Sequence, residues 1–304
     1  MLTKYILVVL LFVLFPYEAR AAVLFSSQAD NGVCGQNVAT AEWDYTGSSE
    51  GVNARMSYQC DTPVPGRSNY YRITTYDLQH DAGNERGIDQ INLTLGTTYY
   101  TGCWIRFDRI NGVDIWHDTG AYPESYDKLW ETRGNMRVIV AAGYPDWVET
   151  GTDHKFTFGL YLFEPYCSGC IYEQAQPNVS PYSRTSPYMA DYERWYSIVI
   201  GFTPSNGSTE NGRVRLWING ILTSDYQNIK TQDSGSPYIS LFMHSTTMAQ
   251  PSYDAPAHHR KYDNFVLSDS LEDMQSAGLM QDPESGTAPT RKLNNVTGVR
   301  VTLH

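Results

Sequence analysis

The chain has 304 residues, of which 41% are hydrophobic and 13% aromatic, and it carries a formal net charge of −11. This acidic balance argues against nucleic acid and anionic membranes as partners. The length is typical of one large β domain, since sandwiches and barrels often reach roughly 200 to 250 residues as a single unit. We expect a monomer with one main core and a tail.

The first 21 residues have the pattern of a secretory signal peptide. Lys4 precedes the apolar run Tyr5–Phe15, and Ala19 and Ala21 supply the small residues at alternate positions that signal peptidase requires. A signal anchor is the alternative, but the run is shorter than the roughly 20 apolar residues of a membrane span. Cleavage after Ala21 would give a soluble, exported protein, extracellular or periplasmic, with a net charge of −12.

Short segments rich in β-branched and aromatic residues predict strands through most of the chain. The clearest are Tyr99–Arg109, Lys128–Thr132, Arg137–Ala141, Lys155–Phe163, Trp195–Thr203, Arg213–Ile218, Tyr238–Met243 and Tyr262–Leu267. Asn219 and Gly220 predict a hairpin after one of them, because both residues tolerate the positive φ of a type I′ turn. Many short strands joined by turns indicate an all-β fold, a two-sheet antiparallel sandwich.

After the last predicted strand, the sequence indicates one short helix and a tail. The helix is expected over Asp269–Ala277, with Asp269 or Ser270 as its N-cap. The following residues are rich in Pro, Gly, Ser and Thr, which is typical of a linker. We therefore predict one domain over residues 22–280, followed by a linker and tail over residues 281–304. The end of that tail is either an edge strand or the start of a further module.

All five cysteines follow the predicted signal peptide, so disulfides are expected. Cys34 and Cys60 are plausible partners, and Cys167 with Cys170 would close a tight loop. Cys103 is then left as a free thiol, buried because it shares the parity of apolar residues in its strand. The Cys-x-x-Cys could instead be redox-active or half of a zinc site. No βαβ pattern surrounds it, however, and no second pair stands at zinc-finger spacing.

Three predicted strands place cations or aromatic rings opposite their apolar residues. In one strand Lys128 and Trp130 fall on the same parity, in another Trp104 and Arg106 do, and His244 belongs to the third. If the apolar sets form one core, these five residues share a surface that suits an acidic sugar. The alternative is a half-solvated sheet whose outer face carries long polar side chains.

Three stretches, Trp195–Ile200, Gly212–Gly220 and Tyr262–Ser268, resemble the concanavalin A-like jelly roll. They match its strand, its hairpin of the form v-x-l-W-v-N-G and its late strand of the form x-D-N-v-x-v. The resemblance covers Tyr99–Ser268 and implies a jelly-roll sandwich. Lectins, glucanases and polysaccharide lyases share this fold, so the motifs specify the fold better than the function.

Within that superfamily, the resemblance implies a polysaccharide lyase. The E-x-D-x-x-E strand of laminarinase-like hydrolases is absent from the sequence, as are the R-x-E-x-R and Y-F-K-A-G-x-Y strands of alginate lyases. The size, the signal peptide and a lysine on a sheet face are most similar to the jelly-roll ulvan lyases, in which a lysine and a tyrosine are implicated in catalysis. The lysine would be Lys128, and the tyrosine would be Tyr253 or Tyr262.

A lyase of this kind removes the C5 proton of a uronate, so it needs a cation on the carboxylate, a base and an acid. Lys128 and Arg106 would supply the cation. Tyr253 is the first choice for the proton transfers, because neighbouring cations favour an ionised phenol. His244 is the second choice as base.

Each of these roles has a structural alternative. Lys128 could pair with a carboxylate of its own strand, such as Glu131, and Arg106 could pair with Asp108. His244 could be a hydrogen-bonded residue that only shapes the site.

Other residues are candidates for substrate binding. Trp104, Trp130 and Tyr161 could stack on the C–H faces of sugars, and the alternative for each is a place in the core. Arg260 lies in the most basic stretch of the chain, which could rim the site and recruit sulfate or carboxylate groups, or could be a solvated loop. His117 belongs to a His-Asp pair that could contact substrate or only order a turn.

This chemistry requires no cofactor and no metal. The carboxylates of Asp61, Asp81, Glu85 and Asp89 could hold a structural Ca²⁺, but they lack the ordered spacing of an EF-hand loop. Solvated carboxylates are the default interpretation of this cluster.

The sequence thus favours a secreted lyase acting on an anionic, uronate-containing polysaccharide, with ulvan as the preferred example. A non-catalytic carbohydrate-binding module is the main rival. A glycoside hydrolase ranks third, because it needs two carboxylates roughly 5 to 10 Å apart across the substrate. Only Glu131 and Glu164 are near suitable strands, and we expect both at core-facing positions or strand ends. A structural surface protein is a further alternative.

Overall fold

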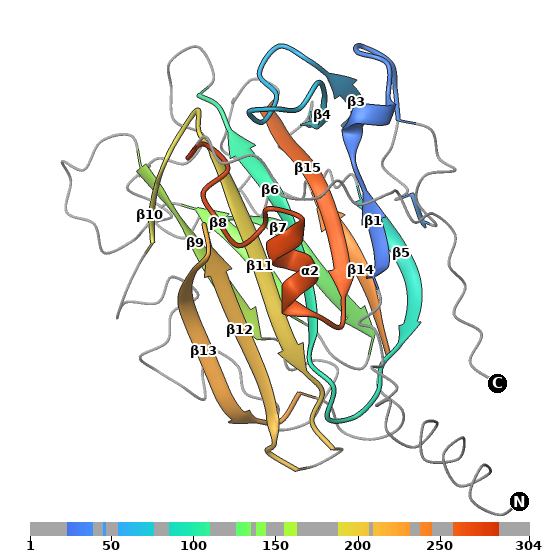
Figure 1. The fold of residues 1–304 in the computed structure, drawn as a ribbon, viewed down its shortest axis with the longest axis vertical. Coiled ribbons are helices and arrows are strands. Elements are labelled where there is room, and N and C mark those ends of the chain that lie inside the picture. Colours follow the sequence, from blue (N-terminus) through green and yellow to red (C-terminus); the bar gives the residue numbers. More distant parts are fainter. Residues whose placement is uncertain are drawn as a thin grey trace, which may run out of the picture.

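The computed structural model describes residues 23–38, 45–46, 54–75, 85–109, 126–134, 138–143, 155–162, 188–206, 209–231, 238–244 and 258–285. Within these residues the chain forms two antiparallel sheets packed face to face, with one short α-helix on the outside (Figure 1). This is the all-β jelly-roll sandwich that the strand pattern predicts. None of the helices in the described ranges is long and apolar enough to cross a membrane.

The first sheet has eight strands, seven of them in the order β13-β12-β11-β6-β15-β4-β3. The eighth strand, β1, pairs with the second half of β15, whereas β4 pairs with its first half. Its strands are β1 (Val23–Ser27), β3 (Ala54–Gln59), β4 (Tyr70–Thr75), β6 (Tyr99–Phe107), β11 (Trp195–Thr203), β12 (Gly212–Ile218), β13 (Ile221–Ile229) and β15 (His258–Ser268). We call it the eight-stranded sheet.

The second sheet has seven strands, in the order β10-β9-β8-β7-β14-β5-β2, so that β7 lies in the middle. Its strands are β2 (Tyr45–Thr46), β5 (Glu85–Asn92), β7 (Tyr126–Gly134), β8 (Val138–Gly143), β9 (Lys155–Leu162), β10 (Met189–Asp191) and β14 (Tyr238–His244). We call it the seven-stranded sheet. The strands β6 and β7 follow each other in the chain but belong to different sheets.

The main core lies between the two sheets and is rich in aromatic residues. Phe107 at the end of β6 and Phe156 of β9 come from different sheets, and their ring centroids are 5.2 Å apart. Phe158, two residues farther along β9, is also buried in this core. Phe156 and Phe158 therefore mark the inward-facing positions of β9, and the register relates the neighbouring strands to them.

A second hydrophobic cluster covers the outer face of the eight-stranded sheet, beneath the helix α2 (Leu271–Ser276) (Figure 1). Met274 of the helix belongs to it together with Trp104 of β6 and Trp195 of β11. The helix begins as predicted, because the hydroxyl of Ser270 accepts a hydrogen bond from the backbone N–H of Glu272. This sheet is thus covered on both faces over much of its area.

The predicted hairpin joins β12 to β13. Asn219 and Gly220 both have positive φ, 51° and 76°, as a type I′ turn requires. A glycine is required at the second position for a further reason, since a Cβ on Gly220 would lie 2.2 Å from the carbonyl oxygen of Met280. The hairpin prediction is confirmed.

The Asp-Asn pair of β15 holds three separate segments together. The Asp263 Oδ1 accepts hydrogen bonds from the backbone N–H groups of Ala29 (2.9 Å) and Asn264 (2.7 Å). The Asn264 amide donates to the carbonyl oxygen of Ala277 (2.7 Å) and accepts from the side chain of Gln28 (3.1 Å). The two residues that carry part of the resemblance therefore have a structural role, which explains why this motif specifies the fold.

Asp263 makes the stability of the fold depend on pH. Burial raises the pKa of its carboxyl from 3.8 to about 6, opposed by the charge of Arg67 and the two backbone hydrogen bonds. The stabilisation that comes from the neutral form is complete below the unfolded-state pKa and is lost as the pH rises through the folded-state pKa. Asp263→Asn keeps the Oδ1 acceptor but cannot ionise. We therefore expect the free energy of unfolding of the variant, compared with that of the wild type, to rise by about 2 to 3 kcal/mol between pH 4 and pH 7.5.

Urea unfolding of both proteins at several pH values checks this prediction. Asn is suitable because the Oδ2 that it replaces has no hydrogen-bond partner among the described residues. A stability difference between the two proteins that stays constant from pH 4 to 7.5 would contradict the assignment.

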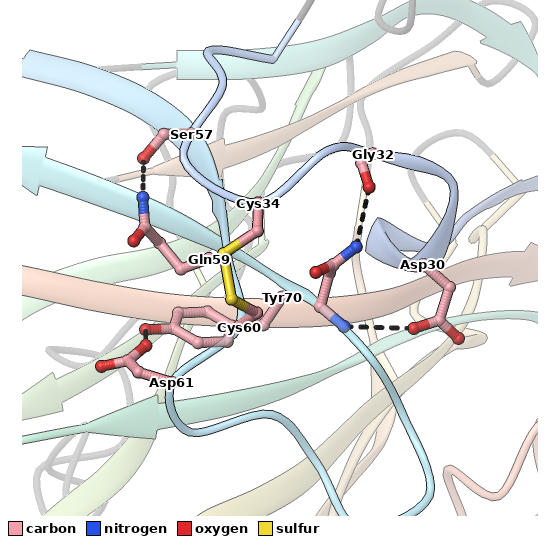
Figure 2. Close-up of a disulfide and its surroundings, with 9 residues drawn as sticks. Asp30, Gly32, Cys34, Ser57, Gln59, Cys60, Asp61 and Tyr70 are labelled. Carbon is pink, nitrogen blue, oxygen red and sulfur yellow. Dashed lines mark hydrogen bonds between the residues drawn. A yellow bond between two sulfur atoms is a disulfide. The ribbon is translucent and has the colours of Figure 1, made fainter.

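The predicted disulfide between Cys34 and Cys60 is present, with Cα atoms 5.7 Å apart (Figure 2). It joins the segment after the short helix η1 (Ala29–Asn31) to the end of β3. Beside it, the hydroxyl of Tyr70 donates a 2.6 Å hydrogen bond to Asp61 (Figure 2). The disulfide therefore fixes the amino-terminal segment against the edge of the eight-stranded sheet.

Replacing both cysteines, Cys34→Ala with Cys60→Ala, is expected to lower the free energy of unfolding by about 2 to 4 kcal/mol. The sequence separation of 26 residues means that the intact bond restricts the unfolded chain substantially. Urea unfolding under non-reducing conditions measures the loss. Adding a reductant should lower the stability of the wild type by about this amount more than it lowers that of the double variant; an equal effect of the reductant on both would contradict this explanation.

Cys103 is a buried free thiol, as predicted. Burial raises its pKa far above the usual range, and the nearby carboxylate of Asp263 contributes in the same direction. A thiol that stays protonated is a poor nucleophile. The second predicted pair, Cys167 and Cys170, lies outside the described residues.

Candidate functional site on the seven-stranded sheet

Lys128 lies on β7, the middle strand of the seven-stranded sheet. It pairs with Ala141 of β8, which in turn pairs with Gly159 of β9. Directly paired residues of antiparallel strands share one face of a sheet. Gly159 follows the core residue Phe158, so it occupies the alternate, outer set of positions. The register therefore places Lys128 on the outer face, at the centre of the sheet.

His244 occupies a neighbouring position on the adjacent strand. In β14, Phe242 pairs with Glu131 and Met243 pairs with Trp130, so His244 comes next in the direction of Lys128. His244 also pairs with Glu85 on the other side of its strand. The prediction that the lysine and the histidine share a face agrees with this register.

A second outer row runs parallel to the first. Tyr161 of β9 pairs with Ile139, which pairs with Glu131, which pairs with Phe242. Tyr161 is two residues from Gly159 on the same strand, so both belong to the outer set. Glu131 is thus on the same face as Lys128 and inside the strand, so the prediction of a core-facing position or a strand end for it is wrong.

Trp130 does not share the face of Lys128. The pairing of β7 with β8 shifts register between these two residues, which leaves Leu129 as an extra residue in the strand. Trp130 then pairs with Val140, which pairs with Leu160, a position of the same parity as Phe158. Simple alternation failed here because a β-bulge reverses the parity of every residue beyond it.

Trp104 and Arg106 lie on β6, which belongs to the eight-stranded sheet, so the predicted common surface with Lys128 is wrong. Trp104 is only 1% exposed, and its indole N–H donates to the carbonyl oxygen of Gly278 at 3.3 Å. Arg106 forms a 2.6 Å ion pair with Asp108, the structural alternative considered for it. Neither residue is available to a substrate on the seven-stranded sheet.

The basic stretch that includes Arg260 is neither a rim nor a solvated loop. It forms the beginning of β15, where Arg260 and Lys261 are buried. Lys261 pairs with Asp108 and donates a 2.5 Å hydrogen bond to the hydroxyl of Thr62. Tyr262 is fully buried in the main core, which excludes it as the catalytic tyrosine.

Several predictions concern residues outside the described ranges. These residues are Tyr253, His117, Asp81 and Glu164. Of the acidic cluster, Asp61 accepts its hydrogen bond from Tyr70. No group of three or more His, Cys, Asp or Glu side chains that could hold a metal ion occurs among the residues that the structure describes.

Two small residues lie next to Lys128 on the neighbouring strands, which the strand pattern alone does not predict. Ala141 and Gly159 continue its row across two strands. A glycine inside a strand often marks a place where a ligand or another chain approaches the backbone closely. Gly159 within the run from Phe156 to Phe163 is therefore the sequence signal for this feature.

The fold of the chain is similar to those of solved polysaccharide lyases. An alginate lyase, Aly36B, matches with a TM-score of 0.54 at 15% identity, over 80% of this chain and 95% of that one. The chain shares its jelly-roll fold with this enzyme. An endo-β-1,4-glucuronan lyase from the fungus Trichoderma reesei matches with a TM-score of 0.54 at 11% identity, over 86% of this chain and 99% of that one.

A variant of the same alginate lyase, in which a lysine and a tyrosine are replaced by alanine, has been solved in complex with an alginate tetrasaccharide. It matches with a TM-score of 0.53 at 16% identity, over 80% of this chain and 95% of that one. No protein-family model and no curated protein sequence matches the chain. At these identities the comparisons establish the fold alone.

Proposed function

We propose that the protein is a secreted lyase that cleaves a uronate-containing anionic polysaccharide by β-elimination, with ulvan as the favoured substrate. The observation that carries the proposal is the position of Lys128 at the centre of the outer face, beside His244, in a fold shared with alginate and glucuronan lyases. The Cys34–Cys60 disulfide supports secretion, since such bonds persist mainly in oxidising compartments.

In this reaction a base removes the C5 proton of the uronate, and the electron pair forms the C4–C5 double bond. The bond from C4 to the bridging oxygen breaks, and that oxygen takes up a proton. The C5 proton becomes acidic only when the charge of the neighbouring carboxylate is neutralised, which is the role we assign to Lys128. No water is consumed, so the products are a new reducing end and an unsaturated uronate.

We assign the proton transfers to a tyrosine and to His244. Tyr253 remains the first candidate, since a phenol near cations can both accept the C5 proton and return one to the leaving oxygen. Tyr161 is a second candidate, because the register places it on the same face as Lys128. The replacement of a lysine and a tyrosine in the alginate lyase complex supports a pair of these two residue types.

The row next to Lys128 supports substrate binding across the sheet. Ala141 and Gly159 have the smallest side chains available, so a pyranose ring could rest against the strands without displacing larger groups. The uronate carboxylate would then face Lys128, and the neighbouring sugars would extend along the sheet.

Mass spectrometry of the products tests the proposal. The purified protein is incubated separately with ulvan, alginate, glucuronan and a neutral β-glucan. Elimination predicts oligosaccharides from a uronate polymer that weigh one water less than the hydrolysis products. Products with the full hydrolytic mass would indicate a glycoside hydrolase, and binding without any product would favour a carbohydrate-binding module; either result would overturn the proposal.

A further inference from the structure

Arg215 lies on the outer face of the eight-stranded sheet, away from the site described above. Its guanidinium carbon is 4.9 Å from the ring centroid of Trp217 and 5.6 Å from that of Tyr100. Its Nη2 donates a 3.2 Å hydrogen bond to the hydroxyl of Tyr100. The planar cation is thus held by two aromatic rings from two strands, β12 and β6.

The backbone beneath the cluster is shaped to let the two rings meet. Arg215 pairs with Gly201 of β11, which pairs with Tyr100. A Cβ on Gly201 would lie 2.8 Å from the ring of Trp217 and 3.1 Å from that of Tyr100. Only a glycine therefore fits between them, and the cluster is fixed by the fold.

Arg215 forms no ion pair with a carboxylate among the described residues, although its charge contributes to lowering the pKa of Asp225. Asp225 stands directly opposite it in the register, but it accepts two hydrogen bonds from Arg213, at 2.8 and 2.6 Å, and one from Gln227 at 2.8 Å. Arg215 is partly exposed and has no ion pair within the described part of the chain. Its Nε is buried and has no hydrogen-bond partner there, so a ligand would have to bind the terminal nitrogens of the guanidinium.

We propose that Arg215 and Tyr100 form a second polysaccharide-binding site, which takes a carboxylate or sulfate group of an acidic sugar. The terminal N–H groups of the guanidinium can bind either planar or tetrahedral oxyanions, and the partly exposed ring of Tyr100 suits the C–H face of a sugar. Because this sheet is opposite the one that carries Lys128, the site would hold a long polymer to the protein without entering the reaction. The choice of ligand rests on the proposed function.

Affinity electrophoresis tests the site. Gels contain alginate, which has only carboxylates, dextran sulfate, which has only sulfates, or neutral dextran, and all chains carry Lys128→Ala so that no polymer is cleaved. Arg215→Gln should weaken binding to at least one acidic polymer about tenfold, and Arg215→Lys should restore only part of it. The polymer that responds identifies the anionic group.

The matched control combines Arg213→Gln with Asp225→Asn. It removes an ion pair from the same face without changing the net charge, and it should alter affinity by less than about twofold. Equal affinity of the Arg215→Gln chain and its parent for both acidic polymers would overturn the inference. A control that loses as much as Arg215→Gln, or no retardation of the parent chain by either acidic polymer, would overturn it as well.

The failure of this inference and that of the proposed function are separable. Product formation is measured on chains with intact Lys128, and polymer retention on chains without it. Loss of retention in Arg215→Gln with no elimination by any chain would support the binding site and reject the lyase. Normal elimination, together with polymer retention that does not depend on Arg215, would support the lyase and reject the binding site.

Discussion

Replacing Lys128 by alanine is expected to reduce the rate of elimination on a uronate polymer by about 10²- to 10⁴-fold. The expectation follows from the position of Lys128 on the middle strand of the seven-stranded sheet, next to His244. Without a cation at the carboxylate, removal of the C5 proton would place a second negative charge beside the first, and a single electrostatic or acid–base group commonly contributes this much. The initial rate of formation of the conjugated unsaturated uronate, followed by its ultraviolet absorbance, measures the effect.

Lys155→Ala is the matched control for this substitution. Lys155 is a lysine of the same sheet, partly exposed and paired with Asp191 of the edge strand β10 at 2.5 Å. Its removal changes the net charge equally but should alter the rate by less than about twofold, since exposed ion pairs contribute little. A Lys128→Ala protein that is folded and as active as Lys155→Ala would contradict the role of Lys128.

Replacing Trp104 by alanine is expected to lower the free energy of unfolding by about 3 to 5 kcal/mol. Trp104 is almost fully buried in the cluster beneath α2, its indole N–H donates to Gly278, and the guanidinium of Arg67 lies 5.0 Å from its ring centroid. The substitution therefore leaves a large cavity and an unpaired carbonyl group. Urea unfolding measures the loss.

Trp104→Phe distinguishes packing from sugar binding. It retains most of the buried ring and should cost clearly less stability than the alanine variant. Both variants, at temperatures at which they are folded, should bind polysaccharide as the wild type does. A Trp104→Ala protein of normal stability that no longer binds the substrate would contradict the assignment of this residue to the outer cluster.

The local pattern of the sequence predicted the strands and turns well because each depends on neighbouring residues. The strand Trp195–Thr203 agrees with β11 at both ends, and Asn219 with Gly220 forms the expected hairpin turn. The Cys34–Cys60 bond and the buried state of Cys103 also agree. These features follow from side-chain chemistry and residue spacing alone.

The candidate site could be predicted only in part, because alternation gives parity within one strand and does not say which sheet the strand joins. Trp104 and Arg106 have the right parity, but β6 belongs to the eight-stranded sheet, whose outer face is covered by α2. Leu129 is an extra residue in β7, so Trp130 falls on the opposite face from the one that simple alternation predicts. Lys128 and His244 are the predicted residues that the register does bring together.

Buried charge was the other feature that the sequence did not reveal. Arg260 and Lys261 read as a basic surface loop, yet they form part of a strand inside the sheet. Lys261 is accommodated because Asp108 and Thr62 satisfy its ammonium group. Asp108 also pairs with Arg106, so one carboxylate binds two cations from adjacent strands. Such partners are distant in sequence from Lys261 and come together only in the folded sheet.

The ultraviolet absorbance of the wild-type protein, incubated with ulvan, alginate, glucuronan, heparin and a neutral β-glucan, tests directly whether the protein is a lyase. Only elimination forms the conjugated unsaturated uronate, so we expect a rise with at least one uronate polymer and none with the β-glucan. We further expect Lys128→Ala to abolish most of that rise and Lys155→Ala to retain it. No rise with any uronate polymer, from a folded protein that still binds one of them, would show that the protein is not a lyase for these substrates.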